Sequence, residues 1–318
     1  MIIVTGGAGF IGSNLVKGLN AVGKNNILVV DNLGNGHKFR NLVDCDYLDY
    51  MDKSEFLGHI IHQTFPYKDV EIVFHQGACS STTEWDGRYM MENNFNYSKK
   101  VLGFCEAHYS PLIYASSASV YGTGRQFDEN GQHEQPLNMY AYSKYLFDSY
   151  VRKTWQERDI KAIGLRYFNV YGPHESHKGA MASIALHLHE QMLDSGVLNL
   201  FRGSDNYGDG EQSRDFIHVD DVVAVNLWCM EEATESGIYN VGTGESRSFN
   251  DVARAVLAFH GKGKLKYIDF PDALKGSYQS YTRADIAALR AAGYKGKFQS
   301  LEQGMQDYLQ WLTAGQGQ

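Results

Sequence analysis

The chain has 318 residues, of which 43% are apolar and 21% charged, so its composition is that of a globular protein with one large or two smaller domains. Its 29 basic and 37 acidic residues give a formal net charge of −8, which gives a nucleic-acid partner no electrostatic support. No apolar run approaches the roughly 20 residues that span a bilayer, so we expect no membrane partner.

Short apolar runs alternate with longer amphipathic ones through the first half of the chain. The short runs predict strands buried on both faces, at residues 2–5, 27–31, 70–78, 111–117 and 161–168. Helical patterns lie between them, near residues 10–22, 53–63, 88–108 and 143–156. This alternation is typical of an α/β fold with a Rossmann-type, doubly wound parallel sheet.

The pattern is looser after residue 170. We expect a strand and a helix within 214–233, a strand and turn at 237–244, and helices at 248–260, 283–293 and 301–314. We therefore predict a dinucleotide-binding domain over 1–170, to which segments near 214–243 return. A smaller, interleaved substrate-binding domain is expected over 171–318. Residues 203–213 (GSDNYGDGEQS) predict an exposed, flexible loop.

Two further features bear on the compartment. The four cysteines, Cys45, Cys79, Cys105 and Cys229, are scattered without a CxxC pair, which favours reduced thiols over disulfides or a zinc site. The first residues, MIIVTGGAGFIG, contain no basic segment before the apolar run, so we expect no signal peptide. Together these features predict a cytoplasmic protein.

The stretch VTGGAGFIGSNLV places Gly6, Gly9 and Gly12 between the first strand and the first helix. Glycines at this GxxGxxG spacing allow a tight turn, close approach of a pyrophosphate and close packing of the helix on the sheet. The positive end of the helix then faces the anion. With Asp31 ending the next strand, the pattern predicts a dinucleotide-binding site.

The choice between NAD and NADP stays open at the level of single residues. Asp31 can accept hydrogen bonds from a ribose 2′-hydroxyl, which favours NAD. Lys38 and Arg40 follow in the next loop and can reach the same ribose, where a lysine can hold the 2′-phosphate of NADP. The alternative for Lys38 is a solvated side chain.

Tyr140 and Lys144 are four residues apart, so they lie one helical turn apart on the same face. Hydride removal from an alcohol needs a base for the hydroxyl proton, and a neighbouring ammonium lowers the pKa of a phenol toward that role. The strand-end segment YASSASVYG supplies hydroxyls that can orient the substrate oxygen. Ser117 is our candidate, with Ser116 and Ser119 as alternates.

With these motifs in place, the chain resembles the extended short-chain dehydrogenase/reductase family over essentially its full length. The strings GACSSTTEWDGRYMMENN, YFNVYGPHESHKGAMAS and RDFIHVDDV resemble, more narrowly, its heptose 6-epimerase branch. This resemblance implies epimerisation of an ADP-linked heptose at C6″ for the lipopolysaccharide core. It also implies NADP as the cofactor and a homo-oligomer, with a pentamer expected.

The resemblance also implies a set of cofactor contacts beyond the glycines. They are Phe10, Ile11, Asp31, Asn32, Lys38, Lys53, Gln76, Gly77, Ala78, Cys79, Ser80, Asn93, Lys144, Val170 and Lys178. The substrate contacts that it implies are Asn169, Ala180, His187, Phe201, Arg202, Gly203, Ser204, Arg214 and Tyr278. Arg214 suits a diphosphate because its guanidinium forms bidentate hydrogen bonds, and its alternative is an ion pair with Asp215 or Asp220.

The resemblance assigns Lys178 as a second acid/base. Returning hydride to the opposite face requires the ketone to turn over, which takes its oxygen away from Tyr140. The alternative for Lys178 is a solvated side chain. We expect no metal, because His174 and His177 lack acidic or cysteine partners at a recognisable spacing. His187 can reach the substrate or be a buried structural histidine, and His174 and His189 are expected to be structural or exposed.

The chain departs from the family pattern at Gln76, where glutamate is common, at Ala180, where serine is common, and in a longer loop at 205–213. The rival functions are a 4-epimerase, which does not need Lys178, another reductase, a 4,6-dehydratase and an idle NADP-binding regulator. Ala118 and Ser119 replace the Asp–Glu pair of the dehydratases. The Ser117, Tyr140 and Lys144 set disfavours the regulator.

Overall fold

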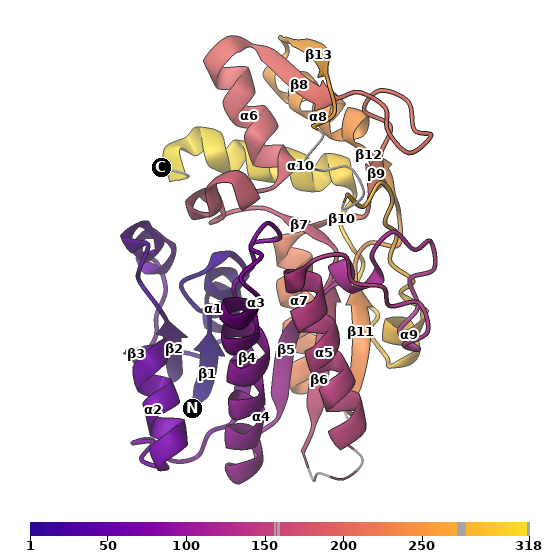
Figure 1. Cartoon of the computed structure of the whole chain (residues 1–318). Helices are drawn as coiled ribbons and strands as arrows, with labels where there is room; N and C mark the ends of the chain where they lie inside the picture. Colours follow the sequence, from indigo (N-terminus) through magenta and orange to yellow (C-terminus); the bar gives the residue numbers. More distant parts are fainter. Residues whose placement is uncertain (156, 158–159, 234, 272–277, 317–318) are drawn as a thin grey trace.

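A computed structural model describes residues 1–155, 157, 160–233, 235–271 and 278–316 of the chain. These residues form a lower lobe around a large sheet and a smaller upper lobe of helices and short strands (Figure 1). Within the described part of the chain, no helix is long and apolar enough to cross a membrane.

The seven strands of the main sheet are all parallel, in the order β11-β6-β5-β4-β1-β2-β3. Their bounds are β1 Ile2–Thr5, β2 Ile27–Asp31, β3 Asp49–Asp52, β4 Ile72–His75, β5 Leu112–Ser117, β6 Ala162–Tyr167 and β11 Gly237–Val241. The predicted doubly wound parallel sheet is confirmed. The strand order reverses between β1 and β4, and ligands of such sheets bind at this reversal, beyond the carboxyl ends of the strands.

Each face of the sheet is covered by helices, and alternate residues of one strand face opposite sides. In β1, Ile2 and Val4 pack with α1 (Phe10–Ala21) and α7 (Val219–Glu231). Ile3 faces the other core, with α2 (Lys53–His62), α4 (Tyr97–Ala107) and α5 (Met139–Thr154). The pattern misses β3 because only Met51 of its four residues is buried, as suits an edge strand.

Two helix boundaries differ from the prediction for local reasons. The helix expected at 143–156 begins earlier, at Met139, because the Asn138 side chain caps it by accepting a hydrogen bond from the Ala141 N–H at 2.8 Å. The helix expected at 88–108 consists of α3 (Gly87–Met90), a π-helical turn (Met91–Asn96) and α4. π-helical turns are frequent at functional sites.

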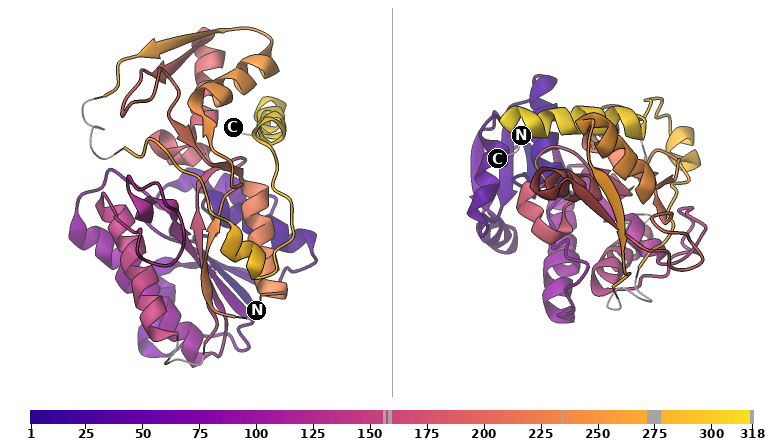
Figure 2. Two further views of the ribbon diagram at one scale, coloured as in Figure 1. Left: turned by 90° about the vertical axis from the view of Figure 1, so that its right-hand side faces the viewer. Right: turned by 90° about the horizontal axis from the view of Figure 1, so that it is seen from above.

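The upper lobe lies above the carboxyl ends of the sheet strands (Figures 1 and 2). Its helices α6 (Ile184–Ser195), α8 (Phe249–His260) and α10 (Leu301–Trp311) share one core with strands β8 (Val197–Phe201) and β13 (Lys264–Ile268). Of two short strand pairs, β7 (Asn169–Tyr171) with β10 (Phe216–His218) lies between the lobes, and β9 (Ser213–Arg214) with β12 (Arg247–Ser248) lies beside α10 (Figure 1). The helix expected at 283–293 is only a short α9 (Ala287–Ala291) beside β11.

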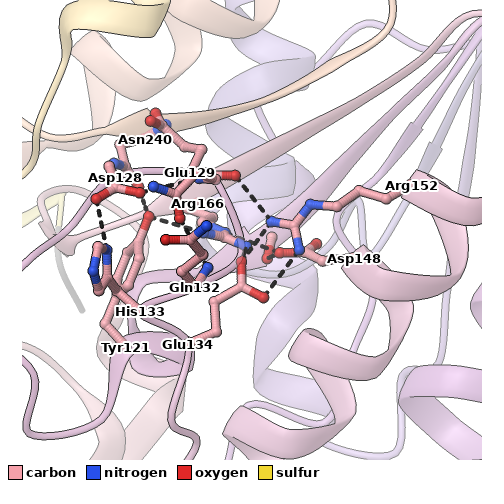
Figure 3. A network of polar contacts seen from close by, with 12 residues as sticks. Tyr121, Asp128, Glu129, Gln132, His133, Glu134, Asp148, Arg152, Arg166 and Asn240 are labelled. Atoms are coloured by element: carbon pink, nitrogen blue, oxygen red, sulfur yellow. Dashed lines mark hydrogen bonds and ion pairs between the residues drawn. The ribbon is translucent and has the colours of Figure 1, made fainter.

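A network of charged side chains lies between α5, β5 and β6 (Figure 3). The fully buried Arg166 of β6 donates from Nε to Asp148 of α5 at 2.9 Å and from Nη1 to the Tyr121 hydroxyl at 2.8 Å. Its Nη2 contacts the Glu134 carboxylate, which also accepts from Arg152 at 2.9 Å. Because each charge has an opposite charge in direct contact, the network fixes α5 and the segment before it to the sheet.

We expect Arg166→Met to lower the free energy of unfolding by about 3–5 kcal/mol, because Asp148 and Glu134 lose a buried counter-charge. Urea denaturation at neutral pH measures this loss. The control is Arg254→Met, which breaks the exposed pair with Asp251 and is expected to cost less than about 1 kcal/mol. Equal losses in the two variants would contradict this account of the network.

Candidate active site

The loop between β1 and α1 is packed so tightly that it requires glycine at two positions. Gly6 has φ +69°, and a Cβ there would lie 2.5 Å from the Gly77 nitrogen. A Cβ on Gly12 would lie 2.1 Å from the Gly6 carbonyl oxygen. Gly9 caps α1 without a side-chain hydrogen bond, and the first turn of α1, which includes Phe10 and Ile11, has no acidic residue. The backbone N–H groups at this helix end therefore suit an anion.

Asp31 and Lys38 meet beside this loop. The Asp31 carboxylate accepts hydrogen bonds from the N–H groups of Ala8 at 2.9 Å and Asn32 at 2.7 Å. Lys38, from the 3-10 helix Gly36–Leu42, donates to Asp31 Oδ1 at 2.5 Å. The predicted pair is thus brought together next to the glycines, whereas Arg40 is exposed.

The segment after β4 is held by asparagine. Asn94, in the π-helical turn, accepts from the Cys79 N–H at 2.8 Å and donates to the Cys79 carbonyl at 2.9 Å and to Ser143 Oγ at 3.0 Å. It therefore joins the predicted 76–80 segment to α5. Lys53 donates to Asn93 Oδ1 at 2.6 Å, so these two predicted residues also meet. Gln76 donates to Asn226 at 3.2 Å.

Tyr140, Lys144 and Ser117 converge at the end of β5. The Tyr140 and Ser117 hydroxyls are hydrogen-bonded, and Lys144 Nζ donates to the Ala115 carbonyl at 2.7 Å. Burial raises the pKa of Tyr140, against which the bond to Ser117 acts. Burial also lowers the pKa of Lys144 to about 8. This arrangement can orient an alcohol and exchange a proton with it.

The two alternates to Ser117 lie elsewhere. Ser116 donates to Asp148 at 2.8 Å, so it faces the charged network below the site. The buried Ser119 hydroxyl has no hydrogen-bond partner among the described residues. Of the three candidate serines, Ser117 is the one whose side chain interacts with the Tyr140 hydroxyl.

Lys178 lies next to the glycine loop between β1 and α1. It occupies the short turn Ser176–Met181, and its ammonium is 5.0 Å from the centre of the Phe10 ring at the start of α1. Burial lowers its pKa, which the nearby Glu175 carboxylate partly opposes. Val170 and Asn169 lie in β7, on the segment that leads to this loop.

The neighbouring histidines hold the loop in place. Lys17 donates to Nε2 of the buried His174 at 3.0 Å, so His174 Nδ1 carries the proton and donates to Asn41 at 3.3 Å. Asn41 Nδ2 contacts His177 Nδ1 at 3.2 Å and the Ala8 carbonyl at 3.0 Å. Asn41 therefore ties the Lys178 loop to the glycine loop. Burial lowers the pKa of both histidines to about 4.

The other two histidines of this region differ from each other. His189 is buried and hydrogen-bonded to His260 at 3.2 Å, so it is structural. His187 is partly exposed and lies 3.7 Å from Glu190. Within the described ranges, no three His, Cys, Asp or Glu side chains are grouped to hold a metal ion.

Arg214 lies in the upper part of the site. It is buried, and its Nη1 has no hydrogen-bond partner among the described residues. The aromatic rings of Tyr278 and Phe249 lie 4.7 and 5.9 Å from its guanidinium carbon. The described part of the chain contains no ion pair of Arg214 with Asp215 or Asp220. Asp215 instead accepts from Thr243, Gly244 and Ala284.

The remaining predicted substrate residues surround this part of the site. Phe201 ends β8, its ring packs edge-on against Phe270, and Phe270 packs in the same way against Tyr278. Gln212 donates to the Arg202 carbonyl and to Ser204 Oγ, both at 3.0 Å. The Arg202 side chain itself is exposed and pairs with Asp269, and Ala180 is exposed.

The loop predicted at 203–213 is partly exposed, and hydrogen bonds within it and to other segments hold it in place. The Gly203 N–H donates to Asp209 at 2.9 Å, and Ser280 donates to Asp205 at 2.5 Å. Arg125 of the lower lobe reaches the Tyr207 hydroxyl at 3.4 Å. The loop therefore spans the two lobes beside Arg214.

Asn41, Glu175 and Phe249 were not predicted as parts of the site. Asn94 was an alternative to Asn93 on the predicted helix, and both contact residues of the predicted site. Glu175 is buried and accepts from the Ser183 N–H and hydroxyl at 2.6 Å, which no local pattern indicates. Asn41 contacts residues more than 130 positions away, so its role depends on the fold.

The fold and this site define a class of enzyme. The chain belongs to the NAD dependent epimerase/dehydratase family, whose model matches residues 2–242. Its similar solved structures act on nucleotide sugars or hold NAD, so it is a member of a nucleotide-sugar epimerase/dehydratase family that uses a nicotinamide cofactor.

Three of these structures illustrate the similarity. Helicobacter pylori ADP-L-glycero-D-manno-heptose-6-epimerase is 32% identical, with a TM-score of 0.85 over 98% of this chain and 96% of that chain. Thermotoga maritima UDP-glucose 4-epimerase with UDP-glucose is 28% identical, with a TM-score of 0.85 over 99% of both chains. Thermus thermophilus UDP-glucose 4-epimerase with NAD is 28% identical, with a TM-score of 0.79 over 97% of both chains.

We expect the free energy of unfolding to fall as the pH drops from 6.5 toward 4. The folded state keeps His174 neutral down to about pH 4, whereas the unfolded chain takes up a proton near pH 6.5. His174→Asn removes this proton uptake by the unfolded chain. Between pH 7 and 4.5, the free energy of unfolding of the variant should therefore fall by about 2 kcal/mol less than that of the wild type. Denaturant titrations at both pH values measure it. His62→Asn, at an exposed position, is the control, and a wild-type slope in His174→Asn would contradict the assignment.

Proposed function

We propose that the protein converts ADP-D-glycero-D-manno-heptose to ADP-L-glycero-D-manno-heptose by inverting C6″, for synthesis of lipopolysaccharide core heptose. Two ionisable side chains at the carboxyl edge of the sheet carry this proposal: Tyr140 of α5, beside Ser117 at the end of β5, and Lys178, whose ammonium is 5.0 Å from the centre of the Phe10 ring at the start of α1. The similarity to the H. pylori heptose epimerase supports the choice of sugar.

The glycine loop, Asp31 and Lys38 fit a dinucleotide, because the N-terminus of α1 has no acidic residue and no side-chain cap, and Asp31 and Lys38 meet beside it. NADP bound there supplies the chemistry of hydride removal and return at C6″. The protein then has to take up the hydroxyl proton while the oxygen lies on one side of the sugar. It has to return a proton after the oxygen has moved to the other side.

In the oxidation, Tyr140 accepts the proton of the C6″ hydroxyl while Ser117 orients that oxygen. Tyr140 must be a phenolate to accept this proton, and the ammonium of Lys144 stabilises that form. After the ketone turns over, its oxygen lies away from Tyr140, and Lys178 donates the proton. Partial burial of Lys178 lowers its pKa, which favours such a transfer near neutral pH.

The nucleotide half of the substrate is assigned to the upper lobe. A buried guanidinium with an unused N–H is costly unless an anion binds it, so Arg214 suits the diphosphate of ADP. The proposed lining also includes Asn169, Ala180, His187, Tyr278 and the segment 201–204. Because Ala180 has no polar side-chain atom, the sugar hydroxyl near it is left to Asn169 or water.

We also propose NADP as the preferred cofactor. Asp31 Oδ1 already accepts from the Asn32 N–H and Lys38, so little of its capacity is left for a ribose hydroxyl. The Lys38 ammonium, held beside Asp31, is the cation that we assign to the 2′-phosphate. A homo-oligomer, as a pentamer, and a cytoplasmic location belong to the same proposal, and the four free thiols suit a reducing compartment.

We expect Lys38→Ala to weaken NADP⁺ binding roughly ten- to hundredfold, with little effect on NAD⁺, because a charge-assisted hydrogen bond to the 2′-phosphate is lost. Calorimetric dissociation constants for both cofactors measure this selectivity. Arg40→Ala, at an exposed position in the same helix, is the control and should leave both constants within about twofold. Equal weakening of both cofactors in Lys38→Ala would instead make Lys38 a structural partner of Asp31.

The reaction itself is tested by NMR of ADP-heptose incubated with the protein, where we expect inversion at C6″. Tyr140→Phe and Lys178→Met should each reduce turnover by about 10²-fold or more, because each removes one proton source. Lys24→Met, which breaks an exposed pair with Glu71, is the control and should retain wild-type turnover.

Two results would contradict this function. Wild-type turnover in Lys178→Met would exclude the two-base mechanism. Inversion at C4 of UDP-glucose, with no action on ADP-heptose, would place the chain with 4-epimerases like that of T. maritima.

A further inference from the structure

One face of α5 is attached to consecutive residues of β5 by side-chain hydrogen bonds. Tyr140 is bonded to the Ser117 hydroxyl, and Lys144, one helical turn later, donates to the Ala115 carbonyl at 2.7 Å. Asp148, one turn further, continues the same face. The two groups that act on the substrate are therefore the outer part of a longer contact between this helix and this strand.

The inner part of the contact is Asp148. Its fully buried carboxylate accepts from the Ser116 hydroxyl at 2.8 Å and from the Tyr114 hydroxyl at 3.0 Å, both of β5. Arg166 of the next strand donates to the same carboxylate at 2.9 Å. Three donors, one of them the positively charged Arg166, thus compensate the burial of this carboxylate.

We propose that Asp148 is a positioning residue for the oxidation step, whose carboxylate fixes Ser116, and through it the neighbouring Ser117, against the turn of α5 that carries Lys144. The inference rests on Tyr140 as the base of the proposed function, but it does not depend on which nucleotide sugar is the substrate.

Asp148 is placed to affect the positions of both Ser117 and Lys144. Ser116 and Ser117 are adjacent, so a shift of the Ser116 hydroxyl displaces the strand end that holds Ser117. On the helix, Asp148 and Lys144 are four residues apart, so a change in the position of Asp148 also moves the helical turn that carries Lys144. Arg166 is held in turn by Glu134 and the Tyr121 hydroxyl, which gives Asp148 a rigid backing (Figure 3).

Asp148 also acts on Lys144 through its charge. The titratable and charged groups near Lys144 are Asp148 and Tyr140 of α5, His75 of β4, Tyr114 of β5 and Arg166 of β6. Burial lowers the pKa of Lys144 to about 8, and the charge of Asp148 opposes this. His75 is kept neutral, chiefly by burial, with a pKa of about 3. The single negative charge near Lys144 in this set of groups is therefore that of Asp148.

The test is Asp148→Asn in the cofactor-loaded protein, because asparagine keeps the size and removes the charge. We expect kcat to fall about tenfold with KM within about twofold. The pH of half-maximal kcat should rise by about one unit, since a Lys144 that loses its proton more easily no longer stabilises the Tyr140 phenolate.

The matched control is Arg152→Gln, which breaks the Glu134 pair at the far end of the same network. It should lower Tm while leaving the pH profile unchanged. An unshifted profile in Asp148→Asn, with only a lowered Tm as in Arg152→Gln, would overturn the inference and leave Asp148 purely structural.

A second variant covers the case that Asp148→Asn does not fold. Ser116→Ala keeps every charge and removes one donor to Asp148, so kcat should fall about three- to tenfold and Ser116→Thr should restore it. Unchanged kcat in Ser116→Ala would contradict the positioning role.

A readout without sugar separates this inference from the proposed function. In protein labelled with ¹³C-tyrosine and saturated with oxidised cofactor, the Tyr140 resonance, assigned with Tyr140→Phe, can be titrated directly. A higher midpoint in Asp148→Asn supports the inference even if ADP-heptose is not the substrate, and an unchanged midpoint overturns it even if ADP-heptose is epimerised.

Discussion

A guanidinium does not lose its proton inside a protein, so an arginine in the middle of a buried strand obliges the fold to bring carboxylates to it. Arg166 meets this requirement with Asp148 from α5 and Glu134 from the segment before α5. The helix that carries Tyr140 and Lys144 is thereby fixed to the sheet by a contact that tolerates little sliding. In the proposed mechanism, Tyr140 and Lys144 depend on that contact, because they lie on the same helical face as Asp148.

Much of the fold could be predicted because its signals are local. Strands buried on both faces appear as continuous apolar runs, and β1, β2, β5 and β6 match the predicted segments to within a residue or two. The glycine spacing and the four-residue step from Tyr140 to Lys144 are equally local. Strand β3 was missed since an edge strand buries only one of its residues, and the start of α5 was missed since its cap, Asn138, stands outside the periodic segment.

The parts of the site that escaped prediction are contacts between distant segments. Asn41 joins the glycine loop to His174 and His177, and nothing near Asn41 in the chain indicates these partners. His174 was expected to be structural or exposed and no metal was expected; His174 and His177 are neutral hydrogen-bonding partners of Asn41. For Arg166, one local signal did exist: a charged residue interrupts the otherwise apolar run of β6, and such an interruption points to a buried partner elsewhere.

The joint at Asn41 has a consequence for how cofactor preference can change. Asn41 belongs to the 3-10 helix that also carries Lys38, so one short segment contains both the proposed ribose contact and an anchor for the loop of Lys178. Under the proposed function, exchanging this whole segment for one that recognises the other cofactor would also release the anchor of Lys178. Cofactor selectivity and the proposed second proton transfer are then coupled through Asn41, and substitutions that spare Asn41 keep that anchor.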